Sequence, residues 1–237
     1  MELFIKFIYS ISITILLAHL IKRKGYLDNK GILASSIMSF IILIGTNINW
    51  LILLILFLVL GSLVSKIGKS KKNKIGVCET KRSINNVLAN GLVAVLMILL
   101  NLLGIIPYNI ELLGYIGAIA AGTSDTFSSE LGILSKEQPV LITTFKKINP
   151  GEDGGITFWG TVFGIFGSFI IGLFASILFN NIHLIWIATI SGLFGNIMDS
   201  LAGALFERKK IINNEIVNFI CTLSGCILAI IVGINYI

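Results

Sequence analysis

Two aspartates lie in otherwise apolar stretches of the chain, and each has glycine and hydroxyl residues beside it. Asp125 belongs to the segment 122–130, which reads GTSDTFSSE, and Asp199 belongs to the segment 195–200, which reads GNIMDS. A carboxylate at the centre of a membrane-spanning helix costs roughly 2.5–3.5 kcal/mol on insertion scales, so such a residue usually faces a polar cavity and has a function there. The two aspartates are therefore the first candidates for metal binding or catalysis.

The residues after Asp125 strengthen this interpretation. In a helix, Asp125 and Ser129 lie one turn apart on the same face. A carboxylate with neighbouring hydroxyls can hold hydrated Mg²⁺, which accepts one or two carboxylates together with phosphate oxygens of a substrate. Glu130 would lie to one side of that face. The alternatives are a solvated helix end for Asp125 and a structural pairing with lysine or asparagine for Asp199.

A segment suited to phosphate binding follows. It contains two threonines, two lysines and two glycines: Thr143, Thr144, Lys146, Lys147, Gly154 and Gly155. Lysines act as point charges on phosphate, and glycines let backbone N–H groups approach an anion. The spacing is not that of a Walker A loop. A lysine pair that serves only membrane topology is the alternative.

A second basic patch precedes a helix with polar first turns. Lys81 and Arg82 lead into a stretch that carries Asn86 and Asn90. The two asparagines share a helix face. Because a buried amide is costly unless it is hydrogen-bonded, this face should look into the interior of the protein.

The composition determines what kind of protein must position these residues. The chain has 237 residues, of which 55% are hydrophobic and 13% charged, and its mean hydropathy is +0.94. A soluble domain of this length would need far more charge to cover its surface. Several apolar stretches approach the roughly 20 residues that span a bilayer. We predict an all-α, polytopic membrane protein that forms one domain over residues 1–237.

Eight spans are predicted, with seven as the alternative. They cover residues 3–21, 31–48, 49–65, 84–106, 110–124, 157–179, 184–206 and 216–236. The fifth is short for a full span, so we expect it to be broken or to end inside the protein.

The lysines and arginines predict the orientation. All except Lys6 fall in four clusters, at residues 22–30, 66–82, 136–147 and 208–210. With the N-terminus outside, every cluster lies on the cytoplasmic side, as the positive-inside rule requires. The cytoplasmic loops are then about 66–83 and 125–156, and the site faces the cytoplasm. Topology explains the net charge of +6 better than nucleic-acid binding does, because no folded basic domain is available to present the charge.

Four segments together resemble one family. They are residues 81–91, 124–132, 139–160 and 195–204. The chain resembles the integral-membrane group labelled domain of unknown function 92, or the transmembrane protein 19 family, which includes plant phytyl-phosphate kinases. Phe127 stands where the family usually has tryptophan and Ser128 where it usually has alanine. Glu152 and Asp153 replace small hydroxyl residues; two acids there would repel phosphate or help to hold a metal.

This resemblance implies transfer of a phosphoryl group from a nucleoside triphosphate, CTP or ATP, to a prenyl monophosphate in the membrane. The product is a prenyl diphosphate. The implied Mg²⁺ ligands, which are also the implied catalytic residues, are Asp125, Glu130 and Asp199. The implied phosphate-binding residues are Lys81, Arg82, Asn86, Asn90, Ser129, Thr143, Thr144, Lys146, Lys147, Gly154 and Gly155.

Two other functions fit the same residues. A transporter or flippase for an anion or lipid phosphate would share the intramembrane carboxylates and broken helices. A lipid-phosphate cytidylyltransferase would use the same substrates but release pyrophosphate. A structural membrane scaffold is disfavoured, because it has no need of buried acids or of a long polar loop.

Overall fold

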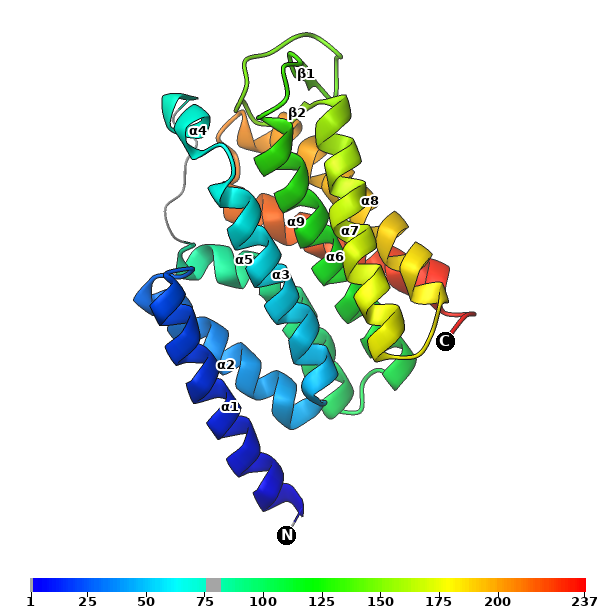
Figure 1. The fold of residues 1–237 in the computed structure, drawn as a ribbon. Coiled ribbons are helices and arrows are strands. Elements are labelled where there is room, and N and C mark those ends of the chain that lie inside the picture. The colour runs from blue at the N-terminus through cyan, green and yellow to red at the C-terminus, as the bar shows by residue number, and fades with distance from the viewer. Residues whose placement is uncertain (1, 76–81) are drawn as a thin grey trace.

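The protein is a bundle of long helices, shown in Figure 1 as a computed structural model that describes residues 2–75 and 82–237. Lys81 lies outside these residues. The helices are α1 (Glu2–Lys24), α2 (Asn29–Gly45), α3 (Ile48–Lys66), α4 (Lys69–Ile75), α5 (Ile84–Leu102), α6 (Tyr108–Gly132), α7 (Phe158–Leu178), α8 (His183–Ala202), the π-helix η1 (Gly203–Glu207) and α9 (Asn214–Gly233). The predicted helical membrane class is confirmed. Within the described residues, six helices are long and apolar enough to cross a membrane, and α2 is a shorter apolar helix.

Helix α6 corrects the prediction of a short or broken fifth span. It runs unbroken for 25 residues and ends at Gly132, so Asp125 lies within the helix and the following loop begins near residue 133. The hydroxyls of Thr123 and Thr126 donate to backbone carbonyls one turn earlier, at 2.7 and 2.8 Å. Because these polar side chains are satisfied within the helix, they do not end it.

Helix α6 is also the centre of the bundle. It packs against α3, α5, α7, α8 and α9, and every residue from Glu111 to Ser124 is buried. Small residues allow α8 and α9 to approach closely: a Cβ added at Gly195 would lie 2.8 Å from the Cys221 carbonyl oxygen, and one at Gly225 would lie 2.7 Å from the Gly117 carbonyl oxygen. Such close helix packing is typical of membrane interiors.

Helix α1 is attached differently from the rest. Only 6% of the 18-residue apolar segment of α1 is buried, whereas the other five long apolar helices bury 39–44% of the corresponding segment. It packs mainly against α2 and projects from the edge of the bundle (Figure 1). The interior is therefore built by α2 to α9, and α1 is a peripheral helix.

Short elements cover one end of the bundle. There the strands β1 (Val140–Leu141) and β2 (Gly155–Ile156) pair antiparallel, near η1 and α4 in Figure 1. The loop that joins the strands rests on η1, because a Cβ at Gly154 would lie 2.5 Å from the Ala204 side chain and backbone. The φ of Gly154 is +75°, a backbone conformation that favours glycine. The predicted polar loop is thus a folded cover over the helix ends.

Candidate active site

A polar cavity of about 940 Å³ lies beneath this cover, between α3, α4, α5, α6, α8 and α9. Many of the predicted site residues line it: Arg82, Asn86, Asn90, Asp125, Ser129, Glu130, Gly154, Gly155 and Asp199. The predicted Thr143, Thr144, Lys146 and Lys147 are not among the described lining residues; all four are exposed on the loop between the strands. The cavity therefore brings together residues from both halves of the chain.

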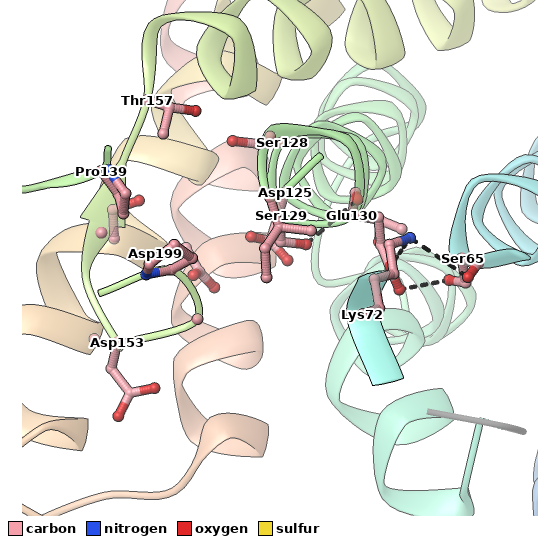
Figure 2. A pocket seen from close by; sticks show the side chains of 18 of the residues that line it. Ser65, Lys72, Asp125, Ser128, Ser129, Glu130, Pro139, Asp153, Thr157 and Asp199 are labelled. Atoms are coloured by element: carbon pink, nitrogen blue, oxygen red, sulfur yellow. Dashed lines mark hydrogen bonds and ion pairs between the residues drawn. The ribbon is translucent and has the colours of Figure 1, made fainter. Parts of the chain in front are cut away.

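The two aspartates that stood out in the sequence meet in this cavity. The side chains of Asp125 on α6 and Asp199 on α8 lie within hydrogen-bonding distance of each other, and Figure 2 shows both in the same part of the cavity. The close contact of α8 with α6 at Gly195, one turn before Asp199, brings them together. Two carboxylates at such a distance repel each other when both are ionised unless a cation or a proton lies between them.

The oxygen atoms around this pair fit a hard cation. One carboxylate oxygen of Asp199, Oδ2, is buried with no hydrogen-bond partner. Mg²⁺ is bound through one or two carboxylates plus substrate phosphates, so a pair of aspartates is a sufficient set of protein ligands. Across residues 2–75 and 82–237, no three acidic, histidine or cysteine side chains form a metal-binding group.

Glu130 therefore does not complete a three-carboxylate metal site, and this part of the prediction needs correction. Its Oε2 accepts a 2.6 Å hydrogen bond from the Lys72 ammonium group, and its Oε1 accepts one from the Ser65 hydroxyl at 2.6 Å. Figure 2 shows Glu130 turned toward these two residues, away from Asp199. Five positions along a helix rotate a side chain by well over one turn, which directs Glu130 to α3 and α4.

Lys72 is a site residue that the sequence did not reveal. Lys72 belongs to the predicted cytoplasmic loop of about 66–83, but residues 69–75 form α4, and Lys72 is 1% exposed. Besides Glu130, its ammonium group donates to the carbonyl oxygens of Val64 and Ser65 at the end of α3. No local pattern distinguishes Lys72 from the other lysines of this segment.

Cationic groups line the cavity on the α3 side. The Arg82 guanidinium lies 5.1 Å from the centre of the Phe57 ring and donates to the Thr126 hydroxyl at 3.5 Å. The Lys66 ammonium lies 4.9 Å from the centre of the Tyr26 ring. Cation–π contacts of this kind help to hold a positive charge in place.

The asparagines of α5 face the interior, as predicted. Asn86 accepts hydrogen bonds from the Ser83 backbone N–H and hydroxyl at 3.1 and 2.6 Å, and so caps the start of α5. Asn90 donates to the Asn86 carbonyl oxygen at 3.0 Å. A Cβ at Gly122 of α6 would lie 3.2 Å from the Asn90 side-chain oxygen. Asn86 thus fixes the helix that follows Arg82, and Asn90 faces α6.

Glu152, one of the two acids that depart from the family pattern, holds the loop between β1 and β2 in place. Glu152 accepts hydrogen bonds from Asn149 and pairs with Arg208 at 2.7 Å. The Asn149 hydrogen bonds, and then Arg208, hold the pKa of Glu152 below its ordinary value. The Gly155 N–H donates to the Glu152 carbonyl oxygen at 3.3 Å, so it serves the turn itself. The glycines thus have a packing role that is visible here, while their phosphate contact stays a prediction.

Comparison with known proteins agrees with the sequence motifs. Residues 12–226 match the family described as integral membrane protein DUF92. The uncharacterized membrane protein MJ0933 of Methanocaldococcus jannaschii is 50% identical over 98% of this chain and 96% of its own length. Protein PGR of Arabidopsis thaliana is 30% identical over 85% of this chain and 79% of its own length. Protein VTE6, chloroplastic, of the same plant is 28% identical over 74% of this chain and 56% of its own length. No solved structure matches the chain.

Proposed function

The chain belongs to the DUF92 family of integral membrane proteins, and from that premise we propose that it is a prenyl-phosphate kinase-like phosphotransferase. It moves the terminal phosphoryl group of CTP or ATP onto a prenyl monophosphate held in the membrane, and the product is a prenyl diphosphate. The resemblance to phytyl-phosphate kinases implies this activity. The observation that carries it is the presence of both carboxylates and cations in one polar cavity.

The cavity contains both acidic and basic side chains. Asp153 and Glu207 lie close enough to Asp199 to interact with it electrostatically. The cations of α3, α4 and the start of α5 that line the same cavity are Lys66, Lys71, Lys72 and Arg82, and Arg82 is close enough to Asp125 to interact with it. Phosphoryl transfer depends almost entirely on positioning and charge neutralisation. A magnesium–nucleotide complex requires carboxylates for the metal and cations for the phosphates, and this cavity contains both.

The residues have distinct tasks in the proposed reaction. An oxygen of the acceptor phosphate attacks the terminal phosphorus, a new P–O bond forms, and the bond to the bridging oxygen breaks, so that the nucleoside diphosphate leaves with that oxygen. Asp125 and Asp199 would hold Mg²⁺, which when bound neutralises charge on the phosphate oxygens. Arg82 binds and orients phosphate oxygens. No general base is needed, because the acceptor phosphate is already an anion.

The experiment uses purified protein with Mg²⁺, CTP or ATP, and geranylgeranyl or phytyl monophosphate. Mass spectrometry should detect the prenyl diphosphate together with one nucleoside diphosphate per turnover. Asp125→Asn and Asp199→Asn should each lower turnover by about 10²-fold or more, since a preorganised electrostatic contact to the transition state is worth that much. Asp28→Asn is the matched control: Asp28 caps α2 through the Gly31 N–H at 2.6 Å, and asparagine caps a helix equally well.

Other results would point to the other functions. Release of pyrophosphate with a cytidylated lipid would identify a cytidylyltransferase. Movement of the lipid phosphate across liposome membranes without nucleotide consumption would identify a flippase. Full turnover in both aspartate variants would refute the metal assignment.

A further inference from the structure

A second cavity, narrow and apolar, lies beside the polar one. It has a volume of about 50 Å³, and its walls come from α1, α2, α3 and α5. Leu17, Met38, Leu54 and Phe57 are among the hydrocarbon side chains that line this apolar cleft. Arg82 and Asn86 line both the cleft and the polar cavity. The two spaces therefore adjoin at Arg82, which borders the apolar cleft and the polar cavity alike.

The cleft runs away from Arg82 along α3. The Arg82 guanidinium lies against Gly61, since a Cβ added there would meet its nitrogens. The α3 residues that line the cleft begin at Leu58, one turn from Gly61, and end at Leu51. At a rise of 1.5 Å per residue, the cleft extends about 15 Å from the level of the guanidinium along the helix. Its length and direction suit an extended hydrocarbon chain with its polar end at Arg82.

The wall formed by α1 and α2 is the adaptable one. Helix α1 packs mainly against α2, and 6% of its apolar stretch is buried, so it is joined to the bundle chiefly through one neighbouring helix. On α2, Met38 lies over Gly91, where a Cβ would be 3.0 Å from its sulfur. Methionine has a flexible side chain that readily changes shape. The cleft can therefore widen toward the bilayer beside α1, on the side from which a lipid would enter.

We propose that the apolar cleft holds the hydrocarbon chain of the lipid monophosphate, with its phosphate at Arg82 where the cleft meets the polar cavity. The identity of the lipid rests on the proposed function; the place of its chain rests on the shared residues. The chain then enters between helices within the membrane, and the phosphate reaches the carboxylates of the cavity without leaving the protein.

The test measures binding without nucleotide, so that it is independent of catalysis. Full-length protein in nanodiscs is titrated with geranylgeranyl monophosphate and, separately, with geranylgeraniol, and bound lipid is quantified by native mass spectrometry. Ser35 lines the cleft, and Ser36 is the next residue on α2 but is not among the described lining residues. Ser35→Phe should weaken the binding of both lipids by about tenfold, and Ser36→Phe should leave it unchanged. Arg82→Gln should weaken the monophosphate alone.

A second variant guards against misfolding of Ser35→Phe. Gly91→Ala adds one methyl group that pushes Met38 toward the cleft, and it should weaken the binding of both lipids in the same direction. Equal effects of Ser35→Phe and Ser36→Phe would overturn the proposal, as would wild-type binding in both cleft variants. A bilayer phospholipid that neither lipid displaces from wild-type protein would also overturn it. If lipid binding depends on the cleft but no turnover is detected, the cleft proposal is supported and the proposed kinase activity is refuted. If turnover is detected and the cleft variants do not change it, the kinase activity is supported and the cleft proposal is refuted.

Discussion

Replacing Lys72 by methionine should release α4 from the bundle. The Lys72 ammonium group is the buried link between three elements, because it donates from α4 to two carbonyl oxygens at the end of α3 and to Glu130 on α6. Methionine keeps most of the apolar stem but removes every one of these hydrogen bonds. The Val64 carbonyl oxygen keeps a second donor, the Ile67 N–H at 3.1 Å, whereas Ser65 is among the last residues of α3, whose carbonyls have no partner further along the helix. The loss therefore falls mainly on Ser65 and Glu130.

The exposures of the two partners set the size of the effect. Breaking a buried ion pair by removing one partner costs about 3–5 kcal/mol. Lys72 is 1% exposed but Glu130 is 24% exposed, and Glu130 keeps the Ser65 hydroxyl as a donor, so water and Ser65 recover part of the loss. We expect the free energy of opening α4 to fall by about 2–3 kcal/mol, which corresponds to a roughly 30- to 150-fold change in the opening equilibrium.

Hydrogen exchange measures this opening directly. The backbone N–H groups of Lys71 and Lys72 donate to the Gly68 carbonyl oxygen at 2.9 and 3.1 Å, and their exchange should accelerate by the factor above in Lys72→Met. Lys71→Met is the matched control: its ammonium group lies on the exposed surface and donates to loop carbonyls at 3.1 and 3.3 Å, so exchange should change less than about fivefold. Equal acceleration in the two variants would refute the assignment of Lys72 as the link.

Two further predictions concern packing and pH. Gly225→Val should lower the free energy of unfolding by about 1–3 kcal/mol through overpacking, because a Cβ there would lie 2.7 Å from a carbonyl oxygen of α6. Thermal unfolding, followed with a thiol-reactive dye, measures this change. The control is Leu223→Val, at a partly exposed position on the same helix. The pKa of Glu152 is held low by Asn149 and then Arg208, so its contribution to loop docking is complete above the ordinary glutamate pKa of about 4.3 and is lost as the pH falls through the lowered value. Exchange in the loop between the strands, corrected for intrinsic rates, should therefore rise below about pH 4, and an unchanged loop in acid would contradict this.

The sequence predicted the helices well because their cause is local. A span of about 20 apolar residues must form a helix in a bilayer, since every backbone polar group has to be satisfied within the segment. The one clear error, at the end of α6, arose where hydroxyl and acidic residues interrupt the apolar run. There Thr123 and Thr126 bond to their own helix, an outcome that hydropathy does not report.

The site was predicted in part for a related reason. Asp125 and Asp199 were visible because an acid in an apolar span is costly wherever it lies. The partner of Glu130 was not visible, since Lys72 is 58 residues away and lies in a run of similar lysines. The exposed Lys146 and Lys147 show the converse: residue type suggested phosphate binding, but the direction of a loop depends on what it packs against.

The sequence by itself determined the membrane class, the helical segments and the two aspartates, because each follows from the cost of placing certain groups in an apolar environment. Only the tertiary structure decided which side chains share a cavity. The close contacts of small residues brought Asp125 to Asp199, and a buried lysine turned Glu130 away from them. Arg82 lies at the border of an apolar cleft and the polar cavity for the same reason. These outcomes depend on how helices distant in sequence pack together, and helix packing is decided by shape complementarity over the whole bundle.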